Sequence, residues 1–214
     1  MGYLHEGHLS LIQEAHKHTN LIVVSIYVNP GQFSPNEDLS TYSSDFQGDI
    51  KKLKTVCNGV DVLFNPKNMY EYGIVNLEMG LRGIFKKGSW HVFFRGVATV
   101  VTKLFNIVEP DVVVFGKKDY QQWRIIQRMV RDLDFGIKVI GSEIVREHDG
   151  LAMCSGNVKL SPENRQKALS ISPALSRTKV EAEKGQVNCR ELINCAIQTI
   201  NEAGGRVDYA EVRT

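Results

Sequence analysis

The chain has 214 residues, enough for one large domain or two small ones. Apolar residues make up 43%, charged residues 23%, and mean hydropathy is −0.19, which excludes a disordered or collagen-like chain. The net charge is only +2 and the basic residues are dispersed, so nothing favours a nucleic-acid partner. The longest apolar run, residues 21–28, is too short to cross a membrane. We expect no membrane segment and, without a secretory signal, a cytoplasmic protein.

Strand-like and helix-like segments alternate along the first two thirds of the chain. Apolar spacing predicts helices over 8–18, 45–57, 97–108 and 119–133, and strands over 21–28, 61–64, 111–115 and 137–140. The stretch 65–90 shows little regular pattern. Strands separated by helices of this length are typical of an α/β fold, here a Rossmann-like doubly wound parallel sheet.

The pattern changes near residue 147. Ser161 and Pro162 mark the start of a helix, and the apolar stripe over 192–200 indicates another that Gly204 closes. Residues 207–212 have the pattern of a strand. We therefore predict a nucleotide-binding domain over 1–146 and part of a smaller α+β domain over 147–214.

The tetrapeptide His5-Glu6-Gly7-His8 stands where the first helix begins. Histidines at i and i+3 lie on one side of the first turn, and the unpaired amides of a helix N-terminus attract phosphate. Gly7 leaves room for a nucleotide against the backbone. Two alternatives remain open: a zinc site, although its usual pattern is HExxH and not HExH, and two solvated surface histidines.

Two further segments follow predicted strands, at the sheet edge where α/β proteins bind ligands. Gln32, in Asn-Pro-Gly-Gln-Phe, has an amide suited to a small polar substrate, or it belongs to a plain turn. The segment from Gly116 to Asp119 offers two lysines and a helix start to a triphosphate, or it is a solvated basic turn. Gln121 and Gln122 lie in the first turn of the next helix.

Several long blocks resemble one family in order and in register. They are MGYLHEGHLSLI, VVSIYVNPGQFSPNEDLSTY, FFRGVATVVTKLFNIVEPDVVVFGKKDYQQW, IIQRMVRDLDF and DGLAMCSGNVKLSP. They are similar to the pantothenate synthetases (pantoate–β-alanine ligases) of the HIGH-motif nucleotidyltransferase superfamily. The resemblance implies an ATP-dependent ligase of pantothenate and coenzyme A biosynthesis, acting through a pantoyl adenylate, with Mg²⁺ accompanying ATP. It also implies a homodimer.

The resemblance further implies roles for individual residues. His8 is expected to donate a proton, His5 to contact phosphate, and Lys118 to act with them in catalysis, while Gln32 and Gln122 bind pantoate. No residue is assigned to a metal. ATP is expected against Met1, Gly2, Tyr3, Leu4, His5, Glu6, Gly7 and His8, against Gly116, Lys117, Lys118 and Asp119, and against Val145, Met153, Cys154, Ser155 and Gly156.

The chain departs from the family pattern at three places. The family usually has arginine where Gly156 stands, so one charged phosphate contact is missing. Met1 stands where the family's first strand ends, so we expect that strand to be absent from the sheet, and the C-terminal domain is expected to be incomplete. These departures predict weak turnover and leave an alternative: an impaired relative that only binds nucleotide or pairs with a full-length subunit. A different adenylyl-transferring enzyme is disfavoured by Gln32 in its motif.

Overall fold

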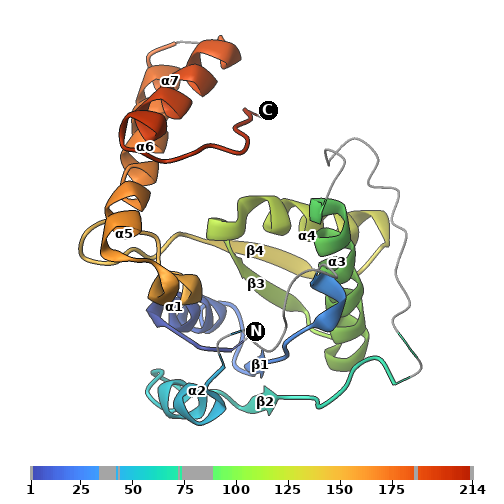
Figure 1. Cartoon of the computed structure of the whole chain (residues 1–214). Helices are drawn as coiled ribbons and strands as arrows, with labels where there is room; N and C mark the ends of the chain where they lie inside the picture. The colour runs from blue at the N-terminus through green and yellow to red at the C-terminus, as the bar shows by residue number, and fades with distance from the viewer. Residues whose placement is uncertain are drawn as a thin grey trace. The chain divides into compact units, whose positions relative to one another are not determined.

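The computed structural model describes residues 2–33, 42, 44–71, 73, 89–185 and 188–212, with 89–91 as backbone only. Met1, expected to contact ATP, lies outside the described residues. The chain divides into two units, Met1–Ile144 and Val145–Thr214 (Figure 1). The first contains α1 (Glu6–Ala15), β1 (Val23–Ser25), η1 (Pro30–Gln32), α2 (Phe46–Leu53), β2 (Val62–Phe64), α3 (Ser89–Val108), β3 (Val112–Gly116), η3 (Lys117–Asp119), α4 (Tyr120–Asp132) and β4 (Lys138–Ser142).

All four predicted strands of the first unit form, and both pairings are parallel. Strand β1 pairs with β2 from Val23↔Val62 onward, and β3 pairs with β4 from Val112↔Lys138 onward. The α/β class with parallel strands is therefore confirmed. Within the described residues the strands form two separate two-stranded sheets, whereas the sequence predicted one sheet.

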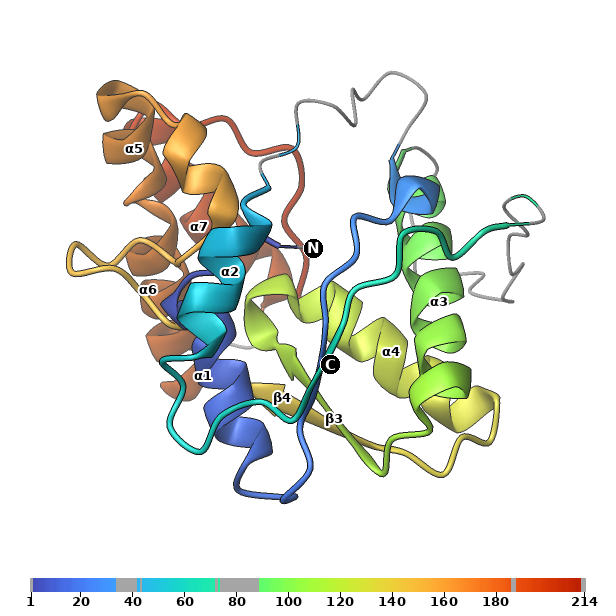
Figure 2. The same cartoon turned by 90° about the horizontal axis from the view of Figure 1, so that it is seen from below.

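Helix α1 joins the two strand pairs through side chains instead of backbone hydrogen bonds. Its Leu9 and Ile12 pack in one buried cluster with Ile22 and Ile26, beside β1. The same helix contacts β3 and β4, and Figure 2 shows α1 and α4 on opposite sides of the β3–β4 pair. Helix α1 is thus fixed by contacts to both pairs.

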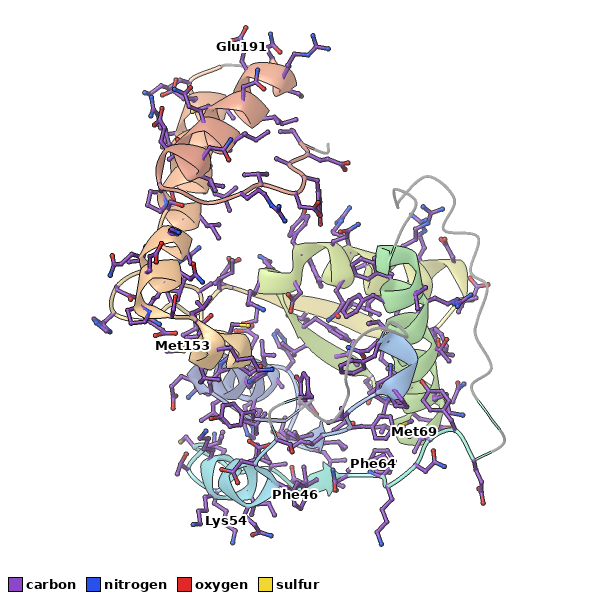
Figure 3. All side chains as sticks on the ribbon, in the orientation of Figure 1. Phe46, Lys54, Phe64, Met69, Met153 and Glu191 are labelled. Atoms are coloured by element: carbon purple, nitrogen blue, oxygen red, sulfur yellow. The ribbon has the colours of Figure 1, made fainter. Side chains whose placement is uncertain are left out.

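A second apolar cluster lies between α3 and α4. Helix α3 supplies Val97, Val101 and Phe105, α4 supplies Ile126 and Met129, and Met69 from the segment after β2 completes it. Figure 3 shows Phe64 at the end of β2 and Met69 farther along that segment. Helix α3 begins at Ser89, well before the predicted residue 97. Of the stretch 65–90, for which the sequence showed little regular pattern, the structure describes 65–71, 73 and the start of α3.

The second unit is mainly helical in its described part, with η4 (Ser155–Lys159), α5 (Pro162–Ala168), α6 (Ile171–Glu183) and α7 (Cys189–Glu202). The predicted cap of α5 is confirmed, because the Ser161 side chain accepts a hydrogen bond from the Asn164 amide at 3.2 Å. The strand predicted over 207–212 is wrong: the residues there form no strand. A strand needs a hydrogen-bonded neighbour, and the β pairing described in this unit is a single bridge between Arg146 and Ala152.

No helix of the described residues is long and apolar enough to span a bilayer.

Candidate active site

The first turn of α1 brings the two predicted histidines together. His5 is the extended residue that precedes the helix, and His8 is the third residue after it. Their ring centroids lie 3.9 Å apart, and the His5 backbone N–H donates to His8 Nδ1 at 3.3 Å. Because Nδ1 of His8 accepts this hydrogen bond, a neutral His8 carries its proton on Nε2. The pair therefore presents imidazole edges at a helix N-terminus.

The surroundings of His8 keep its ring neutral. Burial is the largest cause that lowers its pKa, from 6.5 to about 3, and the charges of His5, Lys118 and Lys52 lower it further. A neutral imidazole donates one hydrogen bond through Nε2 but holds no proton that it can release as an acid near pH 7. The electrostatic effect of Lys118 also shows that η3 lies close enough to act on His8.

The segment before α1 is anchored by a buried acid on α2. Asp49, only 1% exposed, accepts hydrogen bonds from the backbone N–H groups of Tyr3 at 2.9 Å and Leu4 at 2.6 Å. Lys52, one turn along, donates from Nζ to the Leu4 carbonyl at 2.6 Å. Gly2 has a φ of 98°, a left-handed conformation that favours glycine. Two charged side chains thus fix the backbone that leads into His5.

The two lysines of the Gly116–Asp119 segment contact different groups. Gly116 ends β3, and a side chain there would lie 3.8 Å from Leu11 of α1. Lys117 forms an ion pair with Glu143 and stands over the Trp123 ring, 5.6 Å from its centroid. Lys118 instead acts on the His8 charge and contacts Asp119 at 3.3 Å. Of these two lysines, Lys118 is the one whose charge acts on His8.

A buried amide holds the predicted substrate residue Gln32. Asn29, 1% exposed, donates from Nδ2 to Gln32 Oε1 and to the Gly96 carbonyl, both at 3.1 Å. Its Oδ1 accepts from the Gly31 backbone N–H at 3.2 Å and from the Tyr70 hydroxyl at 2.7 Å. All four hydrogen-bonding positions of the Asn29 amide are therefore used.

Gly96 allows η1 to approach α3. A Cβ at this position would come within 2.6 Å of the Gln32 backbone nitrogen and would meet the Gly31 carbonyl oxygen even more closely. Such distances are far below van der Waals contact, so only glycine fits here. The turn that carries Asn29 and Gln32 is therefore seated directly on the α3 backbone.

The second predicted pantoate residue is placed less closely. Gln122 lies half-buried in the first turn of α4, beside Gln121, and no side-chain hydrogen bond between described residues joins it to Gln32. Its position after β3 and η3 agrees with the predicted edge of the strands.

The remaining predicted ATP contacts belong to the second unit. The Met153 backbone N–H donates to the Val145 carbonyl at 3.0 Å, so two of these residues face each other in one hairpin. Cys154 precedes η4, and Ser155 and Gly156 begin it; Figure 3 labels Met153 just before that turn. Arg165 of α5 forms an ion pair with Glu147 of the hairpin at 2.7 Å. Hydrogen bonding to Arg165 lowers the pKa of the Glu147 carboxyl group.

Three residues that hold the site through hydrogen bonds were not predicted from the sequence: Asp49, Tyr70 and Asn29. Asp49 did leave a signal, because it lies three residues after Phe46 and four before Leu53, on the predicted apolar stripe of its helix. A carboxylate on such a stripe must find hydrogen-bond donors when buried. No local pattern singles out Tyr70, which reaches Asn29 across 41 positions of the chain.

Comparison with known proteins decides the family. The family model for pantoate-beta-alanine ligase matches residues 1–214. The chain belongs to the pantoate-beta-alanine ligase family. Its members are ligases that form an amide bond, so the resemblance drawn from the sequence motifs is confirmed.

Relatives and solved structures agree with this membership. The pantoate--beta-alanine ligase of Lotus japonicus is 60% identical over 99% of this chain, and that of Arabidopsis thaliana is 54% identical over 99%. The matches span 78% and 77% of the lengths of these two relatives. The pantothenate synthetase of Thermus thermophilus superposes with a TM-score of 0.85 at 41% identity, over 94% of this chain and 74% of that one. The Francisella tularensis enzyme, solved with beta-gamma ATP and beta-alanine, gives a TM-score of 0.79 at 34% identity, over 100% and 79%.

Proposed function

We propose that this chain condenses pantoate with β-alanine in two steps that share one site. A pantoate carboxylate oxygen attacks the α-phosphorus of ATP, and the bond to pyrophosphate breaks. The β-alanine amine then attacks the acyl carbon of the pantoyl adenylate, AMP leaves, and the amine nitrogen loses a proton. The observation that carries the proposal is the His5–His8 ring pair at the α1 N-terminus, where His8 is neutral and within the electrostatic influence of Lys118, in a chain that matches the family throughout.

The residues around α1 form the nucleotide half of the candidate site: Gly2 to His8, with Lys118 beside them. Nε2–H of His8, the His5 ring and the first amides of α1 supply hydrogen-bond donors to phosphate oxygens, and Lys118 supplies a charge. Since His8 is neutral, we propose that it stabilises the leaving pyrophosphate as a hydrogen-bond donor and not as an acid. Gly116, Lys117 and Asp119 complete the nucleotide contacts.

Magnesium is proposed to arrive with the nucleotide. Among the described residues no group of three histidine, cysteine or acidic side chains is placed to hold a metal ion. Magnesium commonly keeps several waters and binds through substrate phosphates with only one or two carboxylates. The described residues thus do not form a protein cage for this ion.

The amide half of the candidate site comprises Asn29, Gln32, Tyr70 and Gly96. We propose that Gln32 binds pantoate and then β-alanine, with Gln122 as a second pantoate contact. For residues of the second unit, namely the backbone at Val145, and Met153, Cys154, Ser155 and Gly156, the proposed role in ATP binding rests on the family resemblance alone. A homodimer, inferred from the family resemblance, and a cytoplasmic location complete the proposal.

Pantoate-dependent exchange of pyrophosphate into ATP tests the first step directly. We expect exchange with the unaltered chain only when pantoate is present. The His8→Asn variant keeps an acceptor near the His5 amide but loses Nε2–H, and we expect it to slow exchange about 10²-fold or more. His18→Asn is the matched control, because His18 follows α1 and its ring contacts Glu14, away from the paired histidines. ATP binding without exchange would instead support the nucleotide-binding alternative.

A further inference from the structure

The direction of the Gln32 amide is determined by backbone groups that cannot change roles. The Gly31 N–H can only donate and the Gly96 carbonyl can only accept, so Asn29 must turn Oδ1 toward Gly31 and Nδ2 toward Gly96. The second hydrogen of Nδ2 then requires an acceptor, and Gln32 supplies Oε1. The Nε2 group of Gln32, which no described residue accepts from, is left as a pair of donors for a ligand.

Tyr70 stabilises the orientation of the Asn29 amide through the amide oxygen. Its hydroxyl donates to Asn29 Oδ1 at 2.7 Å, the shortest hydrogen bond of the network. Burial, with a smaller contribution from Tyr27, raises the pKa of Tyr70 to about 12, so the phenol stays protonated and remains a donor throughout the neutral range. Without this donor, one lone pair of a buried oxygen lacks a partner, and the Asn29 amide is held by fewer contacts.

We propose that Tyr70 is a positioning residue: its hydrogen bond to Asn29 locks the amide chain that turns the Gln32 Nε2 donors toward the acid substrate. The assignment rests on the proposed function, in which Gln32 binds the substrate. It adds a chemical selectivity, because two N–H donors bind carboxylate or hydroxyl oxygens and not an ammonium group. Gln32 therefore holds β-alanine by its carboxylate end.

The Tyr70→Phe variant tests the assignment kinetically, with Tyr27→Phe as its matched control. Tyr27 is a neighbouring half-buried phenol whose oxygen accepts a 3.4 Å bond from the Met69 amide and lies outside the amide network. We expect Tyr70→Phe to raise the KM for pantoate about five- to tenfold while the KM for ATP stays unchanged. In a Gln32→Ala background the same substitution should have no further effect on the pantoate KM. Equal shifts in both KM values, or a full effect without Gln32, would overturn the assignment.

Side-chain amide exchange measured by NMR gives a test that does not depend on turnover. We expect the Asn29 Nδ2 hydrogens to exchange with water at least about tenfold more slowly than those of Gln32 Nε2, and Tyr70→Phe to accelerate the exchange at Asn29. Similar exchange rates at both residues, or no acceleration, would refute the positioning role. A chain without pantoate-dependent exchange would contradict the proposed function, whereas exchange with an unchanged pantoate KM in Tyr70→Phe would contradict this inference alone.

Discussion

The nucleotide half and the amide half of the candidate site are held in place by different forces. In the nucleotide half, charged side chains from α2 bond directly to the backbone before His5, and a buried carboxylate takes two amide hydrogens. In the amide half, neutral groups form a closed network around Asn29, and the backbone of η1 lies against Gly96. Both halves lie near the end of β1, since Gly2 stands beside Ile26, three residues before Asn29.

The difference indicates what each half contributes. Charge anchoring fixes where a chain segment lies, so its loss leaves buried polar groups unpaired and destabilises the fold. A neutral amide network fixes which way donors and acceptors face, so its loss alters substrate binding as well as stability. Changes in the amide half should therefore add an effect on the pantoate KM to their effect on unfolding, whereas Asp49 and Lys52 should act mainly on unfolding.

The largest effect is expected from Asp49→Ala. The substitution removes the acceptor of two backbone N–H groups, Tyr3 and Leu4, and should lower the free energy of unfolding by about 2–6 kcal/mol. Asp45→Ala on the same helix is the control: it loses a single exposed cap to Gly48, worth about 1 kcal/mol. Urea denaturation of both variants measures the difference. Equal losses would show that the buried carboxylate is not the anchor of the nucleotide half.

Gly156→Arg tests the charge that the family usually carries at this position of the second unit. The position has no positive φ and a Cβ there meets only Cys154 Sγ, at 3.6 Å, so a side chain can begin there without strain. By restoring the charge typical of the family, it should raise kcat by up to about 10²–10³-fold and leave the pantoate KM unchanged. Val158→Arg, at a residue of the same turn with 62% exposure, adds an equal charge as a control. If both variants gain equally, the gain is general electrostatic attraction and not a specific contact.

Gly96→Ala should disturb the amide half. The added methyl group would overlap the Gly31 carbonyl and the Gln32 nitrogen, so η1 and α3 must separate at a cost of about 1–3 kcal/mol. The displaced Gln32 should raise the pantoate KM more than the ATP KM. Gly136→Ala has no atom within 4 Å of the new Cβ and serves as the control in the same denaturation and exchange measurements. An unaltered pantoate KM would break the proposed link between η1 and substrate binding.

Local patterns in the sequence predicted what local forces determine. The β-branched run around β1, the apolar spacing of α3 and the Ser161 cap each act within a few residues, and each is present. Helix α6 was not predicted; its Pro173 lies in the first turn, where the missing N–H costs nothing. The prediction of a strand over 207–212 was wrong because a suitable local pattern is not enough. A strand also needs a neighbouring strand, and none is described that pairs with these residues.

The candidate site divides in the same way. The histidines, Lys118 and Gln32 stand in motifs whose residue types reveal their chemistry, and the structure places His5 with His8 and Lys118 near them. The residues that hold them are distant in sequence: Asp49 lies 46 positions from Tyr3. Such partners follow from the fold and not from any short pattern, so a single sequence cannot identify them.

The smallest effect at neutral pH concerns the ionisation of His8, which tests whether its ring is neutral before ligand binds. The folded-state pKa of about 3 lies below the ordinary value of 6.5, so between these values the unfolded chain binds a proton that the folded chain does not. The contribution of His8 to stability is therefore complete above pH 6.5 and is lost as the pH falls toward 3, by at most about 1.4 kcal/mol per pH unit. NMR titration of the ring should show no transition near 6.5 in the folded chain but one in urea, and His8→Asn should flatten the acid loss of stability. A transition near 6.5 in the folded chain would mean that burial does not keep His8 neutral, and a fraction of the rings would then meet phosphate as charged donors.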